Sequence, residues 1–95
     1  MQEAEFHKIR LEITERCQMQ QIIIPIKFLQ IELDGRGYEA MDQMLSSVVR
    51  AEDFLGLHEG RLYLLLVDIA EDTTKMVQER LLNKGVRSRD VGDQL

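Results

Sequence analysis

The fold is set by FLGLHEGRLYLLLV, residues 54–67. Two apolar runs, 54–57 and 62–67, enclose the polar segment HEGR, whose glycine suits a tight turn. This arrangement is typical of a β-hairpin, because two strand-forming runs are joined by a short turn-forming segment. The hairpin is therefore expected to supply two strands of a sheet.

The sequence on both sides of the hairpin carries helical and strand patterns. Four further elements are expected: a helix over 1–20, a strand over 26–33, a helix over 38–50, and a helix from residue 72 or 73 to residue 83. Pro25 lies at the entry of the strand, where its missing N–H is tolerated. The order αβαββα predicts a small α/β (α+β) domain, with a mainly antiparallel three-stranded sheet covered by helices.

Composition and charge limit the class of protein. The chain has 95 residues, 44% hydrophobic and 31% charged, so a single small globular domain is expected. We assign residues 1–86 to this domain and residues 87–95 to a flexible polar tail. The net charge of −5 argues against binding to nucleic acid polymers or to a membrane surface, because both require a basic surface.

Cysteine usage and hydropathy indicate a cytoplasmic protein. Cys17 is the single cysteine, so no internal disulfide can form. The longest apolar stretch, 22–29, is interrupted by Pro25 and Lys27 and is too short to span a membrane. The chain is therefore expected in the cytoplasm, alone or as the cytosolic part of a larger membrane-associated protein.

Three short motifs lie before the hairpin, at its turn and in the last expected helix. Arg50-Ala51-Glu52-Asp53 precedes the hairpin, the turn reads Glu59-Gly60-Arg61-Leu62-Tyr63, and Gln78-Glu79-Arg80-Leu81 lies in the last expected helix. Over about residues 6–86 this order resembles GGDEF domains, the diguanylate cyclase family. In that family Arg-x-x-Asp marks an inhibitory site for cyclic di-GMP, and the hairpin reads Gly-Gly-(Asp/Glu)-Glu-Phe. The chain is most similar in kind to PelD-type cyclic di-GMP receptors of exopolysaccharide secretion, whose GGDEF domain is degenerate.

The hairpin lacks the groups that a cyclase needs. The resemblance places Arg61 where the family has a metal-binding acid, and a cation there repels Mg²⁺. Glu59 replaces the first glycine, and Leu62 carries no polar group. Glu32 and Asp34 align with the acidic positions at the end of the first strand. We therefore expect no enzyme activity, no bound metal and no cofactor.

The resemblance implies a ligand site formed by Arg50, Asp53 and Arg80. A guanidinium can donate two parallel hydrogen bonds to guanine, and a carboxylate can accept from its N–H groups. The expectation is a catalytically inactive cyclic di-GMP receptor that engages a protein partner or a second copy of itself. A role in exopolysaccharide secretion follows only from the resemblance.

Two alternatives stay open. Arg50 and Asp53 could form an ordinary surface ion pair at i,i+3 spacing. The same fold could also be a ligand-free protein-interaction or dimerisation module, using an edge strand or the apolar face of the first helix. His7 and His58 are expected to be solvated. Arg87 and Arg89 could form a secondary anion patch, but a solvated tail is the preferred interpretation.

Overall fold

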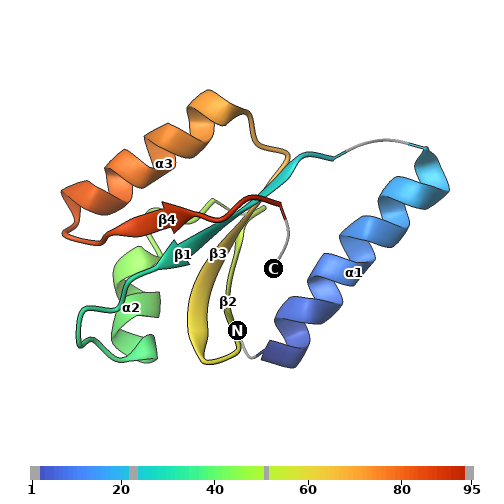
Figure 1. Cartoon of the computed structure of the whole chain (residues 1–95). Coiled ribbons are helices and arrows are strands. Elements are labelled where there is room, and N and C mark those ends of the chain that lie inside the picture. Colours follow the sequence, from blue (N-terminus) through green and yellow to red (C-terminus); the bar gives the residue numbers. More distant parts are fainter. Residues whose placement is uncertain (1–2, 22–23, 51, 94–95) are drawn as a thin grey trace.

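A computed structural model describes residues 3–21, 24–50 and 52–93 of the chain. Its elements, in order, are α1 (Glu3–Gln20), β1 (Ile26–Ile31), α2 (Tyr38–Leu45), β2 (Phe54–His58), β3 (Arg61–Val67), α3 (Glu71–Asn83) and β4 (Ser88–Asp90). The strands form one antiparallel sheet in the order β2-β3-β1-β4 (Figure 1). From β1 onward this is the βαββαβ arrangement of ferredoxin-like domains, preceded by an extra helix. The expected α+β class is confirmed.

Within the described ranges the sheet has four strands, so the prediction of three was wrong. The fourth, β4, lies within residues 87–95, which were expected to form a flexible polar tail. It pairs with β1, and backbone bonds flank it: Glu32 donates to the Arg87 carbonyl over 2.9 Å, and Val91 donates to the Phe28 carbonyl over 3.0 Å. Because these bonds involve only main-chain atoms, polar side chains do not prevent the strand.

The boundaries of most elements match the sequence pattern. α3 ends at Asn83, as expected, because Gly85 adopts a φ of 78° and the Val86 amide donates to the Leu81 carbonyl, a Schellman-type end. The helix expected over 38–50 stops at Leu45 instead. The chain turns from Ser46 to Val49. These four residues are two serines and two valines, and both residue types have low helix propensity, so the helix does not continue.

Helices cover both faces of the sheet. α1 lies on one side, and α2 and α3 lie on the other (Figure 1). The α1 face contains Phe6, Phe28, Tyr63 and Leu65. The opposite face holds the larger apolar cluster, which includes Leu29, Leu64 and Leu66 of the two central strands together with Met41, Leu45, Val77 and Leu81 of α2 and α3. Alternate residues of β1 and β3 thus enter two separate cores.

None of the helices in the described ranges is both long and apolar enough to cross a membrane.

Candidate functional site

The structure brings Arg50 and Asp53 together. Arg50 Nε donates to Asp53 Oδ2 and Arg50 Nη2 donates to Asp53 Oδ1, each over 2.8 Å. This two-pronged geometry matches the planar guanidinium to the planar carboxylate. The i,i+3 spacing therefore predicted the contact, although neither Arg50 nor Asp53 belongs to a helix.

Asp53 is buried, so this is not a surface ion pair. Its side chain is 1% exposed, against 25% for the side chain of Arg50. Two backbone amides complete its coordination: Val67 N–H donates to Oδ1 over 3.2 Å, and Arg50 N–H donates to Oδ2 over 3.3 Å. A carboxylate offers about four lone-pair sites, and all of these are used within the fold.

The pair also joins two distant parts of the chain. Arg50 Nη2 donates to the Val67 carbonyl over 2.9 Å, so both polar backbone groups of Val67 are held at the end of β3. The carboxylate of Asp53 raises the pKa of Arg50 through these hydrogen bonds, against an opposing effect of burial. Arg50 and Asp53 therefore hold the loop before β2 against the end of β3.

Arg80 does not bond to this pair among the contacts of the described residues. It is exposed in the last turn of α3, and none of the described residues forms a hydrogen bond or an ion pair with it. Its guanidinium is thus available to solvent, whereas the acceptor groups of Asp53 are not. Of the three residues expected to bind the ligand, Arg50 and Asp53 are therefore bonded to each other, and Arg80 is exposed.

The two acidic residues after β1, Glu32 and Asp34, both pair with the side chain of Arg87. Arg87 Nη2 donates to Asp34 Oδ1 over 2.8 Å, and Arg87 Nε lies 3.2 Å from Glu32 Oε2. The hydrogen bond to Asp34 raises the pKa of Arg87. Arg87 was expected to be solvated, and its side chain is indeed 65% exposed, but it also pairs with both carboxylates. Within the described part of the chain, no group of three or more His, Cys, Asp or Glu residues is arranged to hold a metal ion.

The hairpin turn is packed against α2. Glu59 and Gly60 both have positive φ, at 50° and 76°, as a two-residue hairpin turn requires. The Tyr38 hydroxyl donates to the Gly60 carbonyl over 2.7 Å. This contact fixes the start of α2 beside the turn, and no motif in the sequence indicated it.

The two histidines contact one another, which corrects the expectation that they are solvated. His7 Nε2 lies 2.8 Å from His58 Nδ1, and the His58 ring also meets the edge of the Tyr63 ring. His7 belongs to α1 and His58 ends β2. The pair therefore helps to hold α1 against the hairpin.

Each edge strand of the sheet borders a surface groove. The groove beside β2, here called the acidic groove, has an apolar floor of Leu55, Leu57 and Leu62 and a rim of Glu5, Glu39 and Asp42. Tyr38 lies at the same groove.

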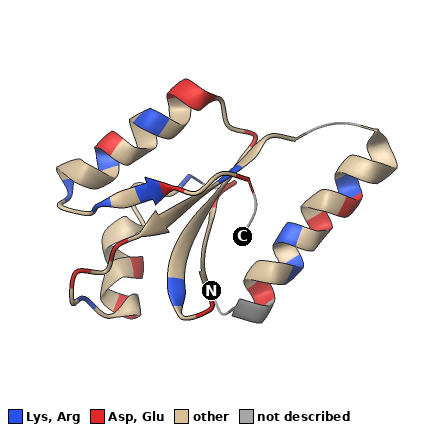
Figure 2. Ribbon diagram, viewed as in Figure 1, with Lys and Arg blue, Asp and Glu red and all other residues tan. Residues whose placement is uncertain are grey.

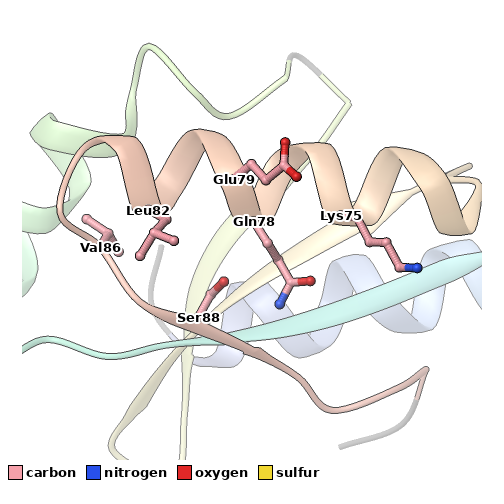
Figure 3. Close-up of a pocket in the computed structure, with 6 residues that line it drawn as sticks. All are labelled: Lys75, Gln78, Glu79, Leu82, Val86 and Ser88. Atoms are coloured by element: carbon pink, nitrogen blue, oxygen red, sulfur yellow. The ribbon is translucent and has the colours of Figure 1, made fainter.

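The second groove, the α3–β4 groove, lies between Lys75, Gln78, Glu79 and Leu82 of α3 and the segment from Val86 to Ser88. Figure 3 shows Gln78 and Ser88 directed into the space between helix and strand. The Ser88 hydroxyl oxygen is buried and has no hydrogen-bond partner among the described residues. Neither groove is lined by Arg50, Asp53 or Arg80.

No family model, no curated protein and no solved structure matches the chain. The resemblance to GGDEF domains therefore stays a prediction.

Proposed function

We propose that this domain is a protein-interaction module that binds extended segments of other proteins through the edges of its sheet. One observation carries the proposal: both edge strands are unpaired on their outer side within the described residues, and each borders a groove against a helix. An open edge offers backbone donors and acceptors in a row, and a neighbouring groove can take alternate side chains.

The register identifies the open backbone groups. The two-residue turn makes His58 and Arg61 a hydrogen-bonded pair, so the amides and carbonyls of Leu55 and Leu57 face away from β3. On the other edge, Arg87 and Val91 bond to β1, so Ser88 and Asp90 present their backbone groups outward. Each edge thus offers two residues for pairing with a further strand.

The geometry of the expected nucleotide site supports this choice over a cyclic di-GMP receptor. Guanine recognition by Asp53 needs free carboxylate oxygens, and both oxygens already accept two hydrogen bonds each. Arg50 also donates hydrogen bonds from Nε to Asp53 and from Nη2 to Val67. Binding the dinucleotide there requires that the pair first open.

A display library of nine-residue peptides tests the proposal. Peptides selected on the intact chain are titrated against Leu57→Pro and Ser88→Pro, which each remove one outward N–H from one edge. We expect selected peptides to lose binding to one of these two variants. Circular dichroism and urea unfolding check that both variants fold.

Cyclic di-GMP is titrated into the same preparations. Micromolar binding of the dinucleotide, with no peptide whose affinity depends on either edge, contradicts the interaction-module proposal. That result would support the receptor hypothesis instead.

A further inference from the structure

We infer that the α3–β4 groove binds an extended partner segment that carries, in order, an acidic residue, a serine or threonine, any residue and an aliphatic residue. The inference rests on the proposed function, and it adds which edge is used and what chemistry the partner carries. Three features of the described chain support it: a cation on β4 without an acidic partner, a hydroxyl without a hydrogen bond, and an exposed leucine at one end of the groove.

The backbone of β4 determines which residue each partner side chain meets. Ser88 and Asp90 present their N–H and C=O groups outward, whereas Arg89 is paired with Gln30 of β1. An added antiparallel strand therefore forms hydrogen-bonded pairs with Ser88 and Asp90, and its intervening residue lies directly opposite Arg89. Residues that lie opposite one another share a face of the sheet, so β4 fixes the face of each partner side chain.

The two faces of β4 carry different chemistry. Ser88 is paired with Ile31 and Asp90 with Leu29, so both side chains lie on the α3 face of the sheet. Arg89, between them, lies on the α1 face. The partner residue opposite Arg89 therefore points away from the groove, and its two neighbours point into it.

Arg89 selects the acidic residue. It is exposed, and none of the described residues forms a hydrogen bond or an ion pair with it. The Cα atoms of a pair of this kind lie about 4.5 Å apart, so a glutamate opposite Arg89 can reach the guanidinium. Opposite charges directly across two strands stabilise the pairing, and like charges oppose it.

Ser88 selects the second hydroxyl. Its Oγ atom has no hydrogen-bond partner among the described residues, and the side chain is directed toward the groove beside Gln78 (Figure 3). Because no bond holds the hydroxyl, rotation about χ1 can turn it further into the groove without the loss of a hydrogen bond. Serine and threonine hydroxyls opposite one another in two strands form hydrogen bonds. A hydroxyl residue opposite Ser88 thus supplies the missing partner.

The end of the groove selects the aliphatic residue. Two positions after the hydroxyl residue, the partner side chain is again on the α3 face, about 6.8 Å further along. In an antiparallel strand this direction leads from Ser88 toward Val86. Leu82 of α3 lines the groove at this end and is 61% exposed. An aliphatic side chain there removes apolar surface of Leu82 from water.

Charge distinguishes this edge from the other one. The acidic groove beside β2 is rimmed by Glu5, Glu39 and Asp42, and none of the described residues that line it is basic. Figure 2 shows acidic and no basic residues on α2, but both kinds on β4. A segment that carries a carboxylate is therefore repelled at β2 and accepted at β4.

A second copy of β4 does not match the same site. In the symmetric antiparallel register, Ser88 of each copy meets Asp90 of the other, and the two Arg89 side chains lie opposite one another. Like charges directly across two strands are destabilising. The occupant is therefore a segment of a different protein.

The probe is a capped octapeptide, Gly-Ser-Val-Glu-Thr-Val-Leu-Ser, titrated into the full chain by calorimetry. The test variant is Arg89→Glu, and its matched control is Arg16→Glu, which makes the same change of net charge at an exposed residue of α1. We expect the test variant to weaken binding about tenfold and the control to change it by less than about twofold, because only Arg89 lies opposite the glutamate. A peptide with lysine in place of glutamate is expected to bind Arg89→Glu more tightly than the wild type.

The hydroxyl pair is tested with Ser88→Ala. This variant should weaken binding of the threonine peptide about threefold and leave the affinity of a peptide with valine in place of threonine unchanged. The urea midpoint of the free variant should equal that of the wild type, because the hydroxyl has no partner in the described part of the fold.

Amide exchange locates the bound peptide. Protection is expected at Ser88 and Asp90, whose N–H groups face outward in the free protein. The inference is overturned by no binding of the peptide, by equal weakening in Arg89→Glu and Arg16→Glu, or by protection at Leu55 and Leu57 instead. In each case the display library still reports whether either edge binds other segments, so the broader proposal is judged separately.

Discussion

The side chain of Phe6 packs directly on Gly56. A Cβ atom built at Gly56 would lie 2.8 Å from the Cβ of Phe6 and closer still to its ring, which is shorter than real contacts allow. Phe6 is fully buried and belongs to the α1 core. The absence of a side chain at Gly56 is therefore what lets α1 approach β2.

The first prediction concerns this contact. Gly56→Ala should lower the free energy of unfolding by about 1–3 kcal/mol, because the added methyl group overpacks the core and must displace Phe6. Urea unfolding followed by circular dichroism measures the change. The matched control is Gly37→Ala, since nothing lies within 4 Å of a Cβ there. Equal midpoints for the two variants would contradict the packing argument.

A second prediction concerns Arg50. Arg50→Met should destabilise the domain by about 3–5 kcal/mol, because it leaves the buried carboxylate of Asp53 without its cation. If Arg50 served only to bind a ligand, its removal would not lower the free energy of unfolding in this way. Glu52→Gln is the control: Glu52 is exposed and 3.4 Å from Arg50 Nη1, so a change below about 1 kcal/mol is expected. A fully stable Arg50→Met variant would return Arg50 to the list of candidate ligand residues.

The pH dependence of this pair gives a third prediction. Asp53 raises the pKa of Arg50 in the folded state, so the contribution of Arg50 to stability is complete below the pKa of an unfolded arginine. It is lost only as the pH rises through the higher folded value. The stability difference between wild type and Arg50→Met should therefore stay constant from about pH 7 to about pH 10. Urea midpoints across this range provide the measurement, and a steady decline would argue against the assigned partner.

A fourth prediction concerns cyclic di-GMP itself. We expect no binding with micromolar affinity, because the acceptor oxygens of Asp53 are already used by Arg50 and Val67. Isothermal titration tests this, with GTP and cyclic di-AMP as controls. If cyclic di-GMP gives binding heat and the two controls do not, the titration is repeated with the Arg80→Ala variant to locate the site. Loss of binding would indicate the site implied by the GGDEF resemblance, and retained binding would indicate a different one.

Much of the fold could be predicted from local patterns. The hairpin and α3 follow from apolar runs, a turn segment and Gly85, which act within a few residues. β4 could not be predicted, because three polar residues pair through backbone atoms with β1, more than fifty residues earlier. A strand of this kind has no side-chain periodicity to detect.

The candidate site shows the same limit. The spacing of Arg50 and Asp53 predicted that they could meet, and they do. The burial of Asp53 could not be predicted, because its carboxylate bonds to Val67, which lies fourteen residues later, at the end of β3. The hydrogen bond from Arg87 to Asp34 joins residues 53 positions apart, and no motif in the sequence indicated it. The open edges became visible only once the strand order was known.

An open sheet edge also affects how copies of a protein behave at high concentration. Here neither edge strand pairs with a further strand among the described residues, and the net charge of −5 keeps copies apart at neutral pH. Acidification neutralises that charge while leaving the edges in place. Copies could then stack edge to edge into growing sheets, so the safest storage buffer for this protein is neutral to alkaline and low in salt, where repulsion between copies is strongest.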